Sequence, residues 1–186
     1  GLDRDREYSF ATAPVAGGAG QLTFFIRHVP GGAFTDWLFA ESRVGQPLEV
    51  SGPGGDFWLR PDDAPLVFIA GGSGLAPILS ILEAALQEGI MRDALFLFGA
   101  RAQRDLYQIE AIRQIASQWK GNFKFVPILS DEPADSDWQG GRGLVTEYLV
   151  PAQVPELGAR HAYLCGPPRM IDAAMTQLYA AGIPEA

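Results

Sequence analysis

The stretch Gly71-Gly72-Ser73-Gly74 places three glycines directly after an apolar run and just before a pattern typical of a helix. Glycine allows a backbone to turn sharply and to approach a phosphate or a ribose closely. The start of a helix adds free N–H groups and the positive end of the helix dipole. Pro77 falls in the first helical turn, where its missing N–H costs little. The stretch predicts a nucleotide-binding loop, with a strand–helix turn that binds no ligand as the alternative.

Two stretches near the amino terminus carry groups suited to a second ligand. Arg6 can neutralise a phosphate, Tyr8 can stack on or hydrogen-bond a planar ring, and Ser9 can donate a hydrogen bond. Taken alone, a surface strand explains this stretch better. Further on, two glycines precede a helix start that could bind a pyrophosphate, formed by Gly32, Ala33, Phe34 and Thr35. An ordinary helix start without a ligand is the alternative there.

The stretch Cys165-Gly166-Pro167-Pro168 ends the last apolar run of the chain. Gly166 allows the close approach of another group, and the two prolines stiffen the turn into the following helix. A lone cysteine is most often a small core residue. In doubly wound folds, however, ligands sit outside the carboxyl ends of the strands. Cys165 is therefore a candidate for either role.

The elements that must position these residues divide the chain in two. The first third indicates strands at 21–29 and 47–52, with 56–60 as a continuation of the second strand past a glycine-rich kink, and a short helix at 31–42. A polar, proline-rich boundary follows at 60–65. Uninterrupted apolar strands then alternate with helices, which predicts a parallel sheet covered on both faces. The expected strands are 65–70, 93–100, 123–130 and 161–166, and the expected helices are 75–89, 105–119, 143–150 and 168–182.

Composition narrows the class of ligand and the compartment. A net charge of -8 argues against binding to nucleic acid or to an anionic membrane surface. The single cysteine excludes a disulfide within the chain and a cysteine-ligated metal centre, so no metal site is expected. The apolar runs are too short to span a membrane, and the first residues do not resemble a signal peptide. We expect a cytoplasmic protein.

Taken together, these stretches resemble the ferredoxin–NADP reductase superfamily of flavin reductases over essentially the whole chain. The flavin motif R-x-Y-S of that family is met at 6–9, its G-x-x-S/T helix start at 32–35, and its nicotinamide loop G-G-[ST]-G-[ILV]-A-P at 71–77. Its C-G-P-x-x-M motif is met at 165–170, and its G-P-x-G-x-F stretch is met at 52–57 with one glycine early or repeated. Residues 98–107 and 162–173 look most like the reductase components of bacterial multicomponent oxygenases.

The resemblance implies a fold, cofactors and partners. It implies a partial antiparallel FAD-binding β-barrel over 1–61 and a doubly wound parallel-sheet NAD(P)-binding domain over 62–186. Family members have about three more barrel strands before the first motif and one more strand at the end, so we expect a fragment of a longer reductase. A [2Fe–2S] centre would belong to a domain outside this chain. The implied electron acceptor is an oxygenase or hydroxylase component, or a ferredoxin.

The resemblance also implies roles for individual residues. It puts Ser9 and Tyr8 at the flavin ring and Cys165 near the nicotinamide as the catalytic positions. It implies that FAD is bound by Arg6, Tyr8, Ser9, Phe25, Ile26, Arg27, Gly32, Ala33, Phe34 and Thr35. It implies that NAD(H) is bound by Gly72, Ser73, Gly74, Pro77, Ala100, Arg101, Ser130, Asp131, Cys165, Gly166, Pro167 and Met170.

The choice between NAD and NADP rests on the residues after the third strand of the second domain. NADP-dependent relatives have a Ser-Arg pair there, whereas this chain has Ser130-Asp131-Glu132. Two carboxylates would repel a 2′-phosphate and could accept a hydrogen bond from a free 2′-hydroxyl. This favours NAD, although Arg101 and Arg104 keep NADP possible.

Three functions of different classes remain open from the sequence. The first is an electron-transfer flavoenzyme that takes hydride from NADH onto FAD. The second is a non-catalytic nucleotide-binding or regulatory module on the same fold. The third is a flavodoxin-like phosphate-binding domain, which has no use for the motifs at 6–9 and 165–170 together.

Overall fold

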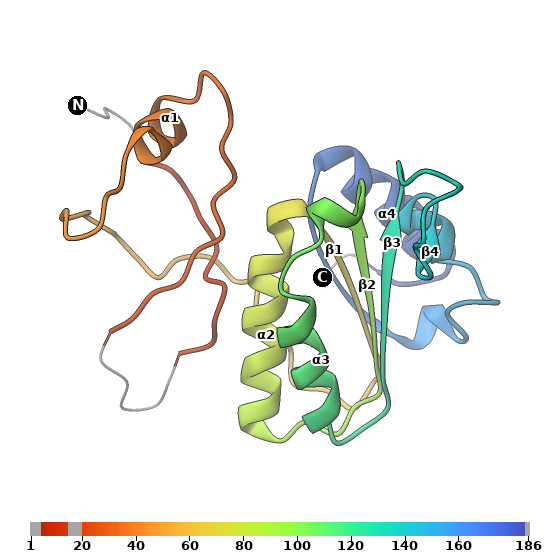
Figure 1. Cartoon of the computed structure of the whole chain (residues 1–186). Helices are drawn as coiled ribbons and strands as arrows, with labels where there is room; N and C mark the ends of the chain where they lie inside the picture. Colours follow the sequence, from red (N-terminus) through yellow and green to blue (C-terminus); the bar gives the residue numbers. More distant parts are fainter. Residues whose placement is uncertain (1–4, 15–19, 185–186) are drawn as a thin grey trace.

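The computed structural model describes residues 5–14 and 20–184. In Figure 1 an amino-terminal part with one labelled helix lies beside a larger α/β part. The α/β part is built on a five-stranded parallel sheet of order β4-β3-β2-β1-β5. Its strands are β1 Leu66–Gly71, β2 Ala94–Ala100, β3 Phe123–Leu129, β4 Gly141–Arg142 and β5 His161–Cys165. The sheet confirms the predicted doubly wound class.

Helices cover both faces of the sheet. One face packs on α2 and α3, and the other packs on α4 and a short 3₁₀ turn, η3 (Figure 1). The helices are α2 Leu75–Glu88, α3 Ile109–Gln118 and α4 Pro168–Ala180, and the 3₁₀ turns are η1 Gly72–Gly74, η2 Gln103–Asp105, η3 Val145–Tyr148 and η4 Leu157–Ala159. No helix among the described residues is long and apolar enough to cross a bilayer.

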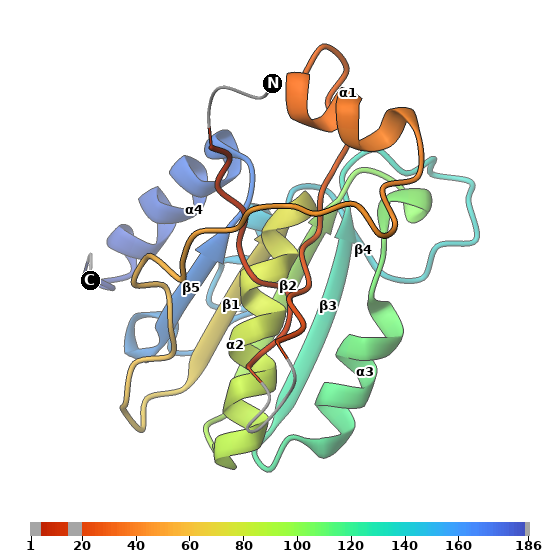
Figure 2. The same cartoon turned by 90° about the vertical axis from the view of Figure 1, so that its left-hand side faces the viewer.

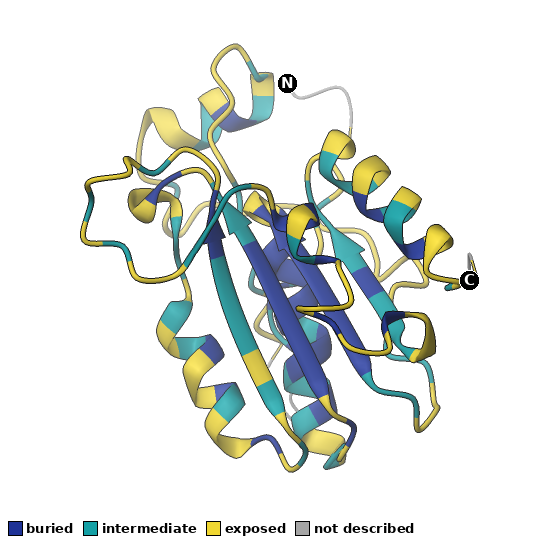
Figure 3. Ribbon diagram, turned by 90° about the vertical axis from the view of Figure 1, so that its right-hand side faces the viewer, coloured by how far each residue is buried: buried dark blue, intermediate teal, exposed yellow. Residues whose placement is uncertain are grey.

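The continuous apolar runs of the strands follow from this double cover. Along β1, Phe68 packs toward α2 and α3, while its neighbours Val67 and Ile69 pack toward α4. Because successive strand residues point to opposite faces, a strand covered on both sides must be apolar throughout. All six residues of β1 are buried, and Figure 3 shows the central strands as the buried heart of the α/β part.

Two predicted helices differ from the structure in detail. The helix predicted at 105–119 begins only at Ile109, because Gln108 adopts a left-handed conformation (φ 58°) that interrupts the helical path after η2. The short helix predicted at 143–150 is the 3₁₀ turn η3. The two-residue strand β4 was not predicted, since so short a segment carries no periodicity.

The strands predicted in the amino-terminal part are not formed among the described residues. Over 21–29 the one strand-like pairing is an antiparallel bridge between Phe10 and Phe24, and 47–52 and 56–60 belong to no strand. A strand requires a hydrogen-bonded neighbour, and these segments have none along most of their length. The helix predicted at 31–42 is confirmed as α1, Ala33–Ala40.

The amino-terminal part is fastened to the α/β part along α2. Ala11 and Ala13 are buried, Ser80 donates a hydrogen bond to the carbonyl of Thr12 (3.1 Å), and the N–H of Ala13 donates to Glu83 (2.8 Å). Figure 2 shows the extended amino-terminal segments running across α2. These contacts fix the first motif relative to the sheet.

Candidate functional site

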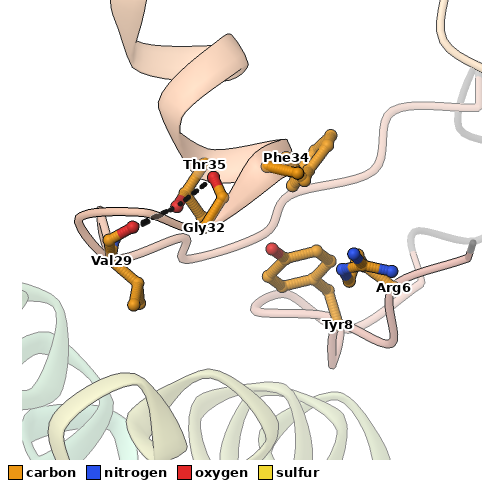
Figure 4. A pocket seen from close by; sticks show the side chains of 7 residues that line it. Arg6, Tyr8, Val29, Gly32, Phe34 and Thr35 are labelled. Atoms are coloured by element: carbon orange, nitrogen blue, oxygen red, sulfur yellow. Dashed lines mark hydrogen bonds between the residues drawn. The ribbon is translucent and has the colours of Figure 1, made fainter. Parts of the chain in front are cut away.

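A pocket of about 210 Å³ lies in the amino-terminal part, between two chain segments. Figure 4 shows Arg6 and Tyr8 reaching it from one segment and the start of α1 from the other. The lining residues are Arg6, Tyr8, Val29, Gly32, Ala33, Phe34 and Thr35. Six of these seven were predicted from sequence to bind FAD, and Val29 was missed because its apolar side chain gave no chemical signal.

The turn that opens the pocket is held by Thr35. Its buried hydroxyl donates to the carbonyl of Val29 (2.9 Å) and accepts from the N–H of Val29 (3.2 Å). A β-carbon on Gly32 would lie 2.7 Å from the Thr35 hydroxyl and 2.9 Å from the Val29 carbonyl. Only glycine therefore fits this closed turn. The Thr35 side chain points into the turn, so the groups left for a ligand are the backbone N–H groups of α1.

These groups fit a pyrophosphate attached to a planar ring system. The first N–H groups of α1 have no partner within the helix and carry the positive end of its dipole. Arg6 adds a cation at the same pocket. The Tyr8 ring is half-buried and lies 5.6 Å from the Phe34 ring at 46°. The pocket thus combines a cationic side chain and a helix start with an aromatic ring.

The other residues predicted at the flavin lie outside the pocket lining. Ser9 is exposed next to Tyr8. On the second segment, Phe25 and Ile26 are half-buried and Arg27 is exposed. Phe25 contacts the α/β part edge-on through Tyr107, with ring centroids 5.2 Å apart at 81°.

The glycine loop after β1 interlocks with the segment that follows β5. A β-carbon on Gly71 would lie 2.7 Å from the sulfur of Met170, and one on Gly74 would overlap the carbonyl of Cys165. A β-carbon on Gly166 would lie even closer to Met170, overlapping its terminal methyl carbon. A β-carbon on Gly72 would contact nothing within 4 Å, but the φ of 55° at this position favours glycine. The loop glycines thus serve packing and turning, which leaves the exposed backbone of 72–73 for a ligand.

Cys165 and Tyr107 lie beside this loop. Burial raises the pKa of the Cys165 thiol, so the sulfur stays protonated at neutral pH. Burial, with a smaller contribution from Cys165, raises the pKa of Tyr107 to about 12. Neither group is ionised at neutral pH, and the described residues contain no group of three or more side chains arranged to hold a metal ion.

The residues expected at the adenosine end come together after β2 and β3. The N–H of Ser130 donates to the carbonyl of Ala100 (3.0 Å), and the Arg101 guanidinium lies 3.4 Å from a carboxylate oxygen of Asp131. Glu132 instead accepts two hydrogen bonds from Gln103, from its N–H (2.9 Å) and its side-chain amide (2.7 Å), which lower the pKa of this carboxyl. Glu132 is therefore engaged in holding η2, a role that sequence reasoning missed.

Comparison with known proteins assigns each half of the chain to a domain family. Residues 68–176 match the family described as oxidoreductase NAD-binding domain, and residues 2–58 match the oxidoreductase FAD-binding domain. The chain is 44% identical over 178 residues to the xylene/toluene monooxygenase electron transfer component of Pseudomonas putida, and 38% identical over 179 residues to the phenol 2-monooxygenase reductase component of Pseudomonas sp. strain CF600. Each alignment covers 96% of this chain and 50% of the relative.

Solved structures agree with this assignment. The crystal structure of an Amycolatopsis cytochrome P450 reductase superposes with a TM-score of 0.81 at 34% identity, over 99% of this chain and 55% of that one. The chain thus spans about half the length of the relatives it matches. It belongs to the ferredoxin reductase-like oxidoreductases, with an FAD-binding domain followed by an NAD-binding domain.

Proposed function

We propose that this chain is the flavin and nicotinamide part of an NADH-dependent reductase. When bound, the two cofactors supply the redox chemistry, in which FAD takes hydride from NADH and releases electrons singly. The protein binds and orients both and needs no general acid or base. The observation that carries the proposal is the pocket lined by Arg6, Tyr8 and the start of α1, because two separate flavin-type motifs meet there.

The proposal extends to domains and residues. We place the boundary between the two domains at 61/62, within the linker 60–65. Arg6 and the N–H groups of Ala33, Phe34 and Thr35 would hold the FAD pyrophosphate, with Tyr8 against the ring and Ser9 near its reactive nitrogen. The exposed backbone of Gly72 and Ser73 would receive the NAD pyrophosphate, and Cys165 and Gly166 would border the nicotinamide.

The proposed acceptor is an iron–sulfur centre outside this chain, which passes electrons to an oxygenase or hydroxylase component, or to a ferredoxin. The names of the relatives support an oxygenase system. The net charge of -8 suits a partner with basic residues at its docking face. A cytoplasmic location, expected from the composition, belongs to the same proposal.

The visible spectrum of the FAD-loaded protein tests this function. Anaerobic addition of NADH is expected to bleach the flavin absorbance much faster than it bleaches free FAD at the same concentration. Binding of NADH to the flavin-loaded protein without bleaching would contradict the proposal and favour the non-catalytic nucleotide-binding module.

A further inference from the structure

Tyr107 touches both domains at once. It lies between η2 and α3, on the loop that follows β2. Its half-buried ring meets Phe98 of β2 edge-on, with centroids 6.0 Å apart at 75°, and meets Phe25 edge-on at 5.2 Å and 81°. Edge-to-face rings at these distances attract each other in addition to burying apolar area. Phe25 is thus held against the NAD-binding domain through the Tyr107 ring.

The hydroxyl of the same side chain holds the dinucleotide loop. Tyr107 Oη donates to the carbonyl of Gly72 at 2.9 Å. That carbonyl also accepts from the N–H of Leu75, where α2 begins. Gly72 is exposed, and a β-carbon placed on it would meet nothing within 4 Å. The Tyr107 bond therefore steadies a part of the loop that has little packing around it.

The Tyr107 hydroxyl can donate its hydrogen bond to Gly72 at any physiological pH. Burial raises the pKa of Tyr107 to about 12, so the hydroxyl keeps its proton throughout the physiological pH range. The neighbouring Cys165 thiol also stays neutral, because burial raises its pKa. The Tyr107–Gly72 hydrogen bond consequently does not switch with pH in this range.

We propose that Tyr107 is a positioning residue that sets the spacing between the flavin side and the nicotinamide loop. The inference rests on the proposed function. One end of the side chain fixes the loop at Gly72, and its ring fixes the segment at Phe25. Hydride transfer depends steeply on how the donor and acceptor rings are held. A side chain that is hydrogen-bonded to one side and packed against the other can define that distance without touching the hydride.

Two variants separate the hydroxyl from the ring. In Tyr107→Phe the ring contacts remain and the bond to Gly72 is lost, so amide hydrogen exchange at Ser73 and Gly74 should quicken and NADH affinity should fall about fivefold. The limiting rate of flavin reduction should fall less than in Tyr107→Leu, because the ring still packs on Phe25. In Tyr107→Leu the ring contacts are lost as well, and the limiting rate should fall about tenfold at saturating NADH.

Tyr148→Phe is the matched control. The Tyr148 hydroxyl also bonds to backbone of the same domain, accepting from the N–H of Arg142 at 3.0 Å, but it lies on η3, apart from the dinucleotide loop. We expect it to leave both loop exchange and flavin reduction unchanged. Thermal unfolding of each variant reports on folding. If Tyr107→Leu keeps the original limiting rate and loop exchange, the positioning role is overturned.

The failure of the proposed function would be visible separately. If NADH does not reduce the flavin of the unaltered protein, the reductase activity is wrong, whatever Tyr107 does. The amide-exchange measurement on the dinucleotide loop then tests the role of Tyr107 by itself. Equal amide exchange at Ser73 and Gly74 in Tyr107→Phe and the unaltered protein would overturn the positioning role.

Discussion

The hydroxyl of Thr35 closes the turn before α1 by bonding to both backbone groups of Val29, donating to the carbonyl at 2.9 Å and accepting from the N–H at 3.2 Å. A residue that sequence analysis assigned to a ligand thus acts on the protein itself. This turn and the start of α1 line the pocket, and the first N–H groups of a helix have no partner within the helix.

Thr35→Val should weaken FAD binding. Valine keeps the volume but leaves the Val29 N–H without its partner and the Val29 carbonyl with only the bond from the Gly32 N–H, so the turn loosens and FAD affinity should fall about tenfold. Titration of the apoprotein with FAD, followed by flavin fluorescence, measures this. Thr35→Ser keeps the hydroxyl and serves as the control. Equal FAD affinity in Thr35→Val and the unaltered protein would show that the turn does not depend on this bond.

Ser9→Ala should slow flavin reduction more than it weakens NADH binding. The exposed hydroxyl is proposed to lie at the reactive part of the flavin ring, where a hydrogen bond stabilises charge that develops during transfer. Stopped-flow reduction by NADH separates the limiting rate from the affinity. The control is Ser42→Ala, an exposed serine after the end of α1. An unchanged limiting rate would remove Ser9 from the mechanism.

Gly74→Ala should destabilise the NAD-binding domain and impair NADH binding together. The added methyl group overlaps the backbone at Cys165, and displacing that backbone costs about 2 kcal/mol. Urea unfolding measures the loss. Gly54→Ala is the control, because a β-carbon there meets nothing within 4 Å. If both variants unfold at the same urea concentration, the loop and the segment after β5 do not pack as described.

Asp131→Asn should improve the use of NADPH. Removing the carboxylate releases Arg101 from its 3.4 Å ion pair and removes a charge that repels a 2′-phosphate, so kcat/KM for NADPH should rise roughly tenfold. Steady-state turnover with each coenzyme tests this. Asp135→Asn, an exposed acid of the same loop, is the control. A native preference for NADPH would overturn the assignment of NAD.

Arg92→Lys should loosen the linker between the domains. The buried guanidinium donates to the carbonyls of Arg60 (3.1 Å) and Ala64 (2.5 Å), a pair of bonds that an ammonium group cannot copy. The free energy of unfolding should fall by about 2 kcal/mol, and proteolysis within 60–65 should quicken. Arg113→Lys, on the exposed face of α3, is the control. Unchanged cleavage would show that the linker is held by other contacts.

The sequence predicted the α/β domain well because its signals are physical necessities of that fold. A strand such as Leu66–Gly71, buried on both faces, must be apolar throughout, and its run is easy to recognise. The strand predictions for the amino-terminal part were wrong. Apolar alternation near Phe24 predicts an extended segment, but it does not identify the segment that pairs with it.

Sequence reasoning could propose site residues where the residue type itself suggests a chemical role, as with Arg6 and the glycines of the loop. It could not find contacts that depend on a partner far away in the sequence. Tyr107 has the pattern of a core aromatic residue, and its bond to Gly72 spans 35 positions. Gln103 similarly reaches Glu132 across 29 positions. Such pairs are invisible to spacing rules, which relate only near neighbours in sequence.

The interlock between the loop after β1 and the segment after β5 has a consequence for protein engineering. Gly71 and Gly74 fit only against the backbone and methionine supplied by Cys165, Gly166 and Met170. A chimera that receives the loop alone from a relative would bring together two surfaces that were never matched. To exchange coenzyme specificity between such enzymes, both segments should be transplanted as one unit, although about ninety residues separate them in the chain.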